Sequence, residues 1–301
     1  MNVTRIRRTG GLALLGATTA LIASAGVARA TDTFVIANQS AFGNGLIATV
    51  DVTTGTFVNS FIPDQAKIGS ANGRGVEVLG TFVYYTELTN GFGPSTGIFV
   101  APFNNGAGGP DIKSFPNPVP GTGIVDLAAA KGLLYAMTGY PSGPEVIQAT
   151  DGNGNNVGGL ITLHTLGGGI LTNSDGLTVL PNGNFLINDG DGVNSYNQYD
   201  PLTGNEIAGT TVSAANCGSA TGVDNNGTSL FFDCNLNSIE VTDFTGAHIS
   251  NTPLPGGNFE DISVIQAAPI TPPSAPEPAS LGILASALLG LGLLGRRSRR
   301  T

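Results

Sequence analysis

One pattern recurs five times along this chain, at intervals of about 47 residues. Each copy consists of a β-branched or aromatic strand, a short turn and a second strand that ends in small polar residues. The copies begin at Val76, Val125, Leu177, Val223 and Ile262, so consecutive copies start 49, 52, 46 and 39 residues apart. A unit repeated at this period predicts a fold built from stacked copies of the unit.

The fifth copy has no second strand, and a matching strand lies at the other end of the chain. Residues 262–265 run into a Pro-rich segment, whereas residues 33–38 (TFVIAN) read like the second strands of other copies. Further strand patterns follow at residues 46–51 and 56–62. Four antiparallel strands per copy at a 40–50-residue period are typical of a β-propeller blade. We therefore expect an all-β propeller of five four-stranded blades over residues 31–266.

Completing one blade from both chain ends removes a free sheet edge, and it predicts that the two ends of the domain meet. Rings of six or seven blades with degenerate members are alternatives, and a β-sandwich is another, although a sandwich does not explain the split copy. For the copy that begins at Leu177, the last two strands are expected at residues 195–200 and 205–207. The D-x-x-T-G-like turns and N-G hairpins resemble those of Kelch, NHL and gluconolactonase-type propellers, although no single family motif repeats cleanly.

The N-terminus has the three parts of a secretory signal peptide. A basic stretch at residues 5–8 precedes an apolar run at residues 12–27, and an A-x-A site ends at Ala30, directly before Thr31. The signal peptide then spans residues 1–30, with cleavage between Ala30 and Thr31. We expect the part of the chain that follows to be exported.

The last 26 residues combine a short polar motif, an apolar run and a basic cluster. The polar motif and the basic cluster consist of Pro276, Glu277, Pro278, Arg296, Arg297, Arg299 and Arg300. As a helix, the apolar run 279–295 reaches roughly 25 Å, the lower limit for spanning a bilayer, and the arginines favour the cytoplasmic side. We expect a transmembrane helix over residues 279–295, after a Pro-rich linker over residues 267–275.

This order of motifs resembles the PEP-CTERM sorting signal of Gram-negative bacteria, also known as the ice-binding-protein C-terminal domain. The resemblance implies processing by an exosortase-type enzyme, anchoring in the inner membrane, and delivery to the cell surface or extracellular matrix. Proteins with this tail are associated with extracellular polysaccharide and biofilm, so a polysaccharide partner is implied as well. The alternative is an ordinary membrane anchor that no processing enzyme recognises.

The exported part is strongly acidic. All 21 acidic residues except Glu277 lie in it, but of the 12 basic residues it holds only Lys67, Arg74, Lys113 and Lys131, which leaves a charge of −16 against −9 for the whole chain. Such a surface repels nucleic acid and other polyanions unless divalent cations bridge them. We expect no nucleic-acid partner, while solubility and cation binding are both compatible with the charge.

Two cysteines flank a hairpin signal. The turn Asn-Asn-Gly at residues 225–227 favours pairing of residues 221–224 with residues 228–235. Pairing outward from this turn puts Cys217 close to opposite Cys234. In an exported protein, these two cysteines are expected to form a disulfide.

Polar residues recur where the inner two strands of each blade meet the mouth of the central channel. The candidate rim residues are Arg74, Asp175, Asn188, Asp189, Asp233, Glu260 and Asp261. Nearby we place Asn38 and Glu87 at second-strand ends, with Glu77, Asp126 and Asp224 at matching positions in first strands. Carboxylates and amides are ligands for a hard cation such as Ca²⁺, and gluconolactonase-type propellers hold a metal near this place. The rim is therefore either a Ca²⁺ site or simply a solvated polar edge.

Nucleophilic catalysis has few candidates. The two histidines, His164 and His248, are expected on outer strands of different blades, and the sequence contains no G-x-S-x-G motif. We predict a non-catalytic propeller with a surface or matrix binding role. The alternative is a Ca²⁺-dependent, lactonase-like hydrolase that acts at the channel mouth.

Overall fold

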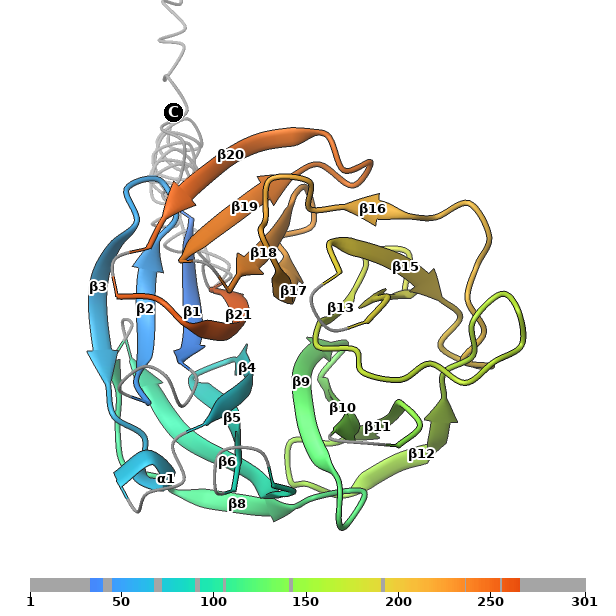
Figure 1. The fold of residues 1–301 in the computed structure, drawn as a ribbon. Coiled ribbons are helices and arrows are strands. Elements are labelled where there is room, and N and C mark those ends of the chain that lie inside the picture. Colours follow the sequence, from blue (N-terminus) through green and yellow to red (C-terminus); the bar gives the residue numbers. More distant parts are fainter. Residues whose placement is uncertain are drawn as a thin grey trace, which may run out of the picture. The chain divides into compact units, whose positions relative to one another are not determined.

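The computed structural model describes residues 33–265 except 40–44, 68–71, 90–92, 105–106, 141–142, 191–192, 236 and 255. In this part of the chain, five antiparallel sheets surround a common centre (Figure 1). The predicted five-bladed propeller is confirmed, and the six- or seven-bladed rings and the sandwich are not the fold. Within the described residues, no helix is long and apolar enough to span a membrane.

The predicted terminal signals lie outside the described residues. They comprise the signal peptide with its cleavage site at Ala30 and Thr31, the linker over residues 267–275, and the tail from Pro276 with its transmembrane helix and arginines. These remain predictions from sequence.

Blade 1 joins the two ends of the described chain. It consists of β21 (Phe259–Ile265), β1 (Phe34–Gln39), β2 (Ile47–Asp51) and β3 (Thr56–Phe61). Strand β1 pairs with β2 on one side and with β21 on the other, where Phe34 lies opposite Ile265. Because β1 has a neighbour on both sides, the ring closes as the split copy predicted.

Each of the other blades is one continuous segment. Blade 2 has β4 (Gly73–Leu79), β5 (Phe82–Leu88) and β6 (Ser95–Asn104), with β7 (Ala107–Gly108) and β8 (Lys113–Pro116) both paired to β6. Blade 3 has β9 (Gly123–Ala130), β10 (Leu133–Tyr140), β11 (Val146–Thr150) and β12 (Asn156–Thr162). Blade 4 has β13 (Leu177–Val179), β14 (Phe185–Asn188), β15 (Ser195–Tyr199) and β16 (Val212–Ser213). Blade 5 has β17 (Ala220–Asn225), β18 (Leu230–Cys234), β19 (Ser238–Thr242) and β20 (His248–Pro253), and the one-turn helix α1 (Asp64–Lys67) precedes blade 2.

The outer strand of blade 4 is not the one that the sequence predicted. Residues 205–207 were expected to form it. They do lie beside the end of β15, where Glu206 bridges to Tyr199 and Ile207 donates its backbone N–H to Gln198, but the outer strand is β16. The Asp200 carboxylate accepts the backbone N–H groups of Leu202 and Thr203, and after this turn Asn205 also bridges to His164 of blade 3.

The hydrophobic core is divided among the five interfaces between neighbouring blades. Between blades 1 and 5, for example, Val35 and Val50 pack with Phe231 and Val241. Four further buried clusters occupy the other interfaces. Each blade therefore depends on both neighbours to bury its two apolar faces.

The predicted disulfide between Cys217 and Cys234 is confirmed, with their Cα atoms 5.0 Å apart. Cys217 lies in the segment that leads into β17, and Cys234 is the last residue of β18. The bond therefore ties the entry of blade 5 to its second strand.

Candidate functional site

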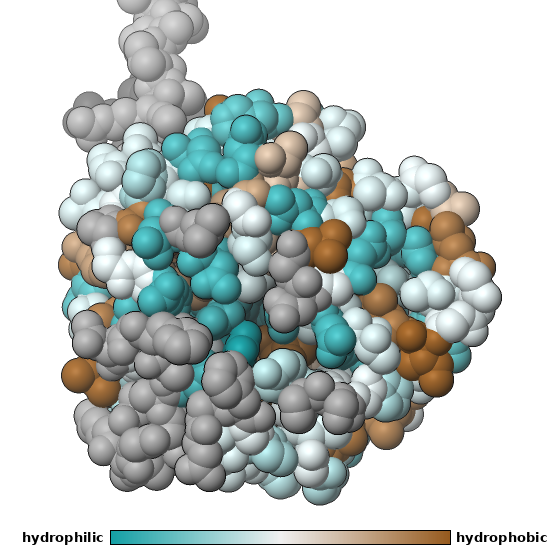
Figure 2. Space-filling view, viewed as in Figure 1, coloured by the Kyte–Doolittle hydropathy of each residue, from teal (hydrophilic) through white to brown (hydrophobic). Residues whose placement is uncertain are grey.

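The innermost strands β21, β4, β9, β13 and β17 surround the centre of the ring, where hydrophilic residues gather on the viewed face (Figures 1 and 2). Two positions of each inner strand lie where neighbouring blades meet. The first is occupied by Asp261, Gly75, Asp126, Gly176 and Gly222, and the second by Ser263, Glu77, Ala128, Thr178 and Asp224. The acidic and hydroxyl side chains among them form a polar seam around the channel.

Acids at the first position hold neighbouring blades together. The Oδ2 atom of Asp261 accepts the backbone N–H of Val76 in blade 2 at 2.6 Å. In the same way, Asp126 of blade 3 accepts the N–H of Leu177 in blade 4 at 2.5 Å. Their other oxygens accept the N–H of the following residue in each strand. Both carboxyls therefore connect neighbouring blades by hydrogen bonds.

The second position continues the seam. Asp224 of blade 5 accepts the N–H of Val264 in blade 1 at 2.6 Å and the Thr178 hydroxyl of blade 4 at 2.9 Å. Ser263 accepts the N–H of Val78 at 3.1 Å. Asp224 and Glu77 occupy matching positions, as expected, but Asp126 matches Asp261 instead. The prediction differed because Asp126 lies four residues before the end of β9, whereas Glu77 lies only two residues before the end of β4.

The predicted rim is buried rather than solvated. Five of its residues form the inner wall, and each residue is at most 7% exposed: Arg74, Asp175, Asp233, Glu260 and Asp261. The other two serve the β14–β15 connection. Asn188 binds Val193 and Gly190 there, while Asp189 accepts Ser195 and Asn197 at 2.7 Å each. Asp189 is therefore engaged within its own blade and does not face the mouth.

Arg74 supplies positive charge to the mouth. Its Nη1 atom donates to Glu260 Oε2 at 2.8 Å, which links blade 2 to blade 1. Its guanidinium also lies 5.5 Å from the ring centroid of Tyr140 in blade 3. A buried ion pair supported by an aromatic face connects three blades, although its net contribution to stability is modest because both charges lose water.

Other carboxyls at the mouth have raised pKa values. Asp233 is 1% exposed, and neither of its oxygens accepts a hydrogen bond from a described residue. Burial and the nearby charge of Glu260 raise its pKa well above the usual range. Burial also raises the pKa of Glu87 to about 9, against the opposing effect of the Asn72 backbone N–H, and that of Glu145 to about 8. Glu87 and Glu145 are therefore protonated near neutral pH and act as neutral polar groups.

Asp126 and Asp261 also face each other. Burial raises the pKa of both carboxyls, and the nearby charge of Asp126 raises that of Asp261 further, because two carboxylates held close together repel each other. The pair links blades 1 and 3, which are not neighbours, across the centre of the ring.

The mouth carboxylates do not come together as a metal cage in the described part of the chain. There, one group of three side chains has its potential ligand atoms within 4.8 Å of one another: Cys217, Cys234 and Glu240. Both sulfurs are in the disulfide and offer no thiolate. Glu240 accepts the backbone and side-chain N–H groups of Asn216. In the described residues, this geometry gives no support to the Ca²⁺ alternative for the rim.

Both histidines lie toward the outside of the ring, as expected. His164 follows β12, and His248 is the first residue of β20. The Nδ1 atom of His248 is 3.2 Å from Glu240 Oε1. Sequence patterns did not indicate this pair, nor the roles of Glu145 and Tyr140, because each depends on contacts between distant strands.

No protein-family model and no curated protein matches this sequence. Among solved structures, the chain is similar to one in the crystal structure of a nidogen/laminin complex, with a TM-score of 0.47, 13% identity, and coverage of 78% of this chain and 100% of that one. A second is the glutaminyl cyclase of Myxococcus xanthus, with a TM-score of 0.44, 15% identity, and coverage of 62% and 76%. A third is apo AztD of Citrobacter koseri, with a TM-score of 0.35, 16% identity, and coverage of 75% and 56%.

Proposed function

We propose that this chain is an exported, non-catalytic β-propeller that a PEP-CTERM-type tail sorts to the cell surface or matrix of a Gram-negative bacterium, where it binds extracellular polysaccharide. The observation that carries the non-catalytic part is the hydrogen bonding of the inner-strand acids. Asp126, Asp224 and Asp261 each accept a backbone N–H from another blade. A general base must reach a proton on a substrate, and these oxygens are already used to hold the ring together.

The export part of the proposal has support from both sequence and structure. A signal-peptide pattern precedes the domain, and the Cys217–Cys234 disulfide is typical of an oxidising compartment. The sorting part rests on the order of motifs from Pro276 to Arg300. Deleting residues 276–301 should move the protein from the membrane fraction to the soluble exported fraction, and unchanged fractionation would contradict the proposed sorting.

The choice of polysaccharide rests on the resemblance of the tail to the PEP-CTERM signal, since proteins with this tail are associated with extracellular polysaccharide. The exported part carries a charge of −16, which disfavours polyanions, so among polysaccharides we favour neutral ones. A rigid ring also holds its loops and inter-blade surfaces in fixed positions for recognition. The test is co-sedimentation of the full-length protein with the polysaccharide of the producing cell. We expect the protein in the pellet; protein that stays in the supernatant would overturn the binding role.

The lactonase alternative is tested separately by thermal melting with Ca²⁺ and with a chelator. If the mouth carboxyls only hydrogen-bond neighbouring blades or stay protonated, neither Ca²⁺ nor the chelator should change the melting temperature. An upward shift with Ca²⁺ that Asp233→Asn abolishes would instead favour a metal site at the mouth. Asp189→Asn is the matched control, because Asp189 is engaged within blade 4.

A further inference from the structure

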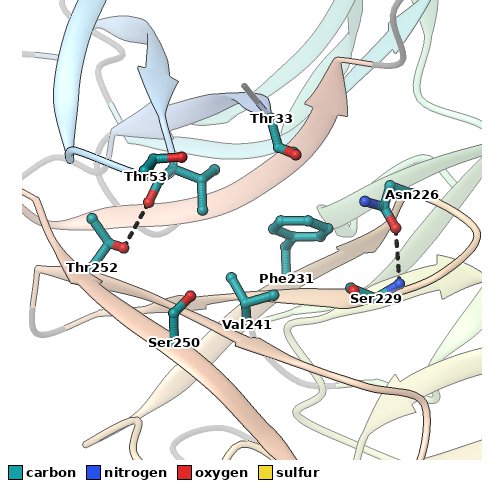
Figure 3. A pocket seen from close by; sticks show the side chains of 9 residues that line it. Thr33, Thr53, Asn226, Ser229, Phe231, Val241, Ser250 and Thr252 are labelled. Atoms are coloured by element: carbon teal, nitrogen blue, oxygen red, sulfur yellow. Dashed lines mark hydrogen bonds between the residues drawn. The ribbon is translucent and has the colours of Figure 1, made fainter. Parts of the chain in front are cut away.

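Blades 1 and 5 enclose a pocket of about 280 Å³ beside the closure of the ring (Figure 3). Blade 1 contributes residues at the start of β1 and after β2, and blade 5 contributes the β17–β18 turn and strands β18 to β20. The lining residues are Thr33, Val52, Thr53, Asn226, Ser229, Phe231, Val241, Ser250 and Thr252. The volume lies just below the usual range for drug-sized ligands, which begins at about 300 Å³, so it suits a small ligand.

The pocket has an apolar floor and polar walls. Val52, Phe231 and Val241 are at most 6% exposed and form the floor. Figure 3 shows the Phe231 ring between Thr33 on one side and Val241 and Ser250 on the other. None of the nine lining residues is charged, although the domain around them is strongly acidic.

The frame of the pocket is held by its own hydrogen bonds. Thr252 donates its hydroxyl proton to the carbonyl of Val52 at 2.6 Å, which joins the two blades. Asn226 accepts the backbone N–H groups of Thr228 and Ser229 with its Oδ1 atom, so its Nδ2 group is left to donate. The hydroxyls of Thr33, Ser229 and Ser250 bond to no other residue in the described part of the chain. Within the described residues, these three hydroxyls and the Asn226 Nδ2 group are therefore available to a ligand.

We infer that this pocket binds one ring of a neutral sugar, an assignment that rests on the proposed polysaccharide function and gives it a location. A sugar ring offers C–H groups to the Phe231 and Val241 floor and hydroxyls to the polar walls. A charged ligand would find no countercharge among the lining residues, and burying it unpaired is unfavourable. The ligand bridges strands from the two ends of the domain, so its binding stabilises the closed ring.

The test measures thermal melting and saturation-transfer NMR of the full-length protein with glucose, galactose, mannose and N-acetylglucosamine, and with glucuronate for comparison. We expect a neutral sugar to raise the melting temperature and glucuronate to have no effect. Ser250→Trp fills the pocket and should weaken binding by about tenfold or more. Ser60→Trp is the matched control, because Ser60 is exposed on the outer strand β3 of blade 1, and it should bind as the unmodified protein does.

Two results would overturn the inference: no binding of any of the four neutral sugars, or full binding by Ser250→Trp. If Ser250→Trp does not fold, Ser229→Arg at the pocket edge replaces it, with the same expected loss. Co-sedimentation separates the inference from the proposed function. A folded pocket variant that still pellets with the polysaccharide refutes the pocket alone, whereas an unmodified protein that neither pellets nor binds a sugar refutes both.

Discussion

Asp261 and Gly222 depend on each other at the centre of the ring. A Cβ atom on Gly222 would lie 2.5 Å from the Cα of Asp261, and one on Gly75 would lie 2.9 Å from the carbonyl carbon of Asp126. An acid at the first inner position therefore requires a glycine on the preceding blade. Gly222→Ala should destabilise the fold by about 1–3 kcal/mol, because backbone must move to admit the methyl group. Chemical denaturation measures this, with Gly159→Ala, which meets nothing within 4 Å, expected to be near neutral; equal effects would contradict the packing argument.

The carboxyl of Glu87 makes stability depend on pH. It stays protonated in the folded state up to about pH 9, whereas its usual pKa is 4.5. The protonated carboxyl therefore contributes fully to the free energy of unfolding below pH 4.5. This contribution is lost as the pH rises through about 9, and the free energy of unfolding falls by at most about 1.4 kcal/mol per pH unit. Glu87→Gln should flatten this part of the profile and raise the melting temperature at pH 8. A Gln variant with an unchanged profile between pH 5 and 8 would refute the protonated state.

For single residues, the sequence predicted where a side chain lies in the ring but not how deeply it is buried or what it contacts. The repeat placed Arg74, Asp233 and Glu260 at the channel mouth, since strand starts and ends follow from the period. Their burial could not be predicted, because it depends on what covers the strand ends. Nor could the pairing of Asp126 with Asp261, because two blades that are not neighbours in sequence supply it.

Blade 5 contains the disulfide of this chain, between Cys217 and Cys234. The disulfide closes a loop with a sequence separation of 17, and in the chain-entropy model its loss costs about 3 kcal/mol. Reduction should therefore lower the denaturation midpoint, and Cys217→Ser with Cys234→Ser should do the same. The double variant is its own control, since the chain has no other cysteine and a reductant should not affect it further. A reductant effect on the double variant would mean that another process is responsible.

Strand prediction succeeded where turn signals were strong and failed where local turn chemistry interfered. The Asn-Asn-Gly turn correctly located β17 and β18. The outer strand of blade 4 was placed too early. After the Asp200 turn, Asn205 bridges to His164 of blade 3 and Glu206 makes an isolated bridge to Tyr199, whereas the regular strand pairing lies at Val212 and Ser213. Such competition between a local turn and a distant partner is not visible in strand patterns.

For the whole molecule, the decisive property is that the two ends of the described domain, residues 33 and 265, meet in blade 1. The split copy revealed this from sequence, because a strand without a partner at one end matched one at the other. Phe34 and Ile265 are paired in the same sheet, so a short linker can join residue 265 to residue 33. The β11–β12 turn at Asn153 is exposed and offers a place for new ends.

A circular permutant built in this way should fold with a melting temperature close to that of the original domain. The β1–β21 pairing is kept in it, and only an exposed turn is cut. A truncation at residue 258 removes β21 and leaves blade 1 without its inner strand, so β1 has a free edge and the cluster around Ile262 is exposed. Melting of the truncated chain should be broad or absent. Cooperative melting of the truncation, or failure of the permutant to fold, would mean that closure by the two ends does not hold the ring together.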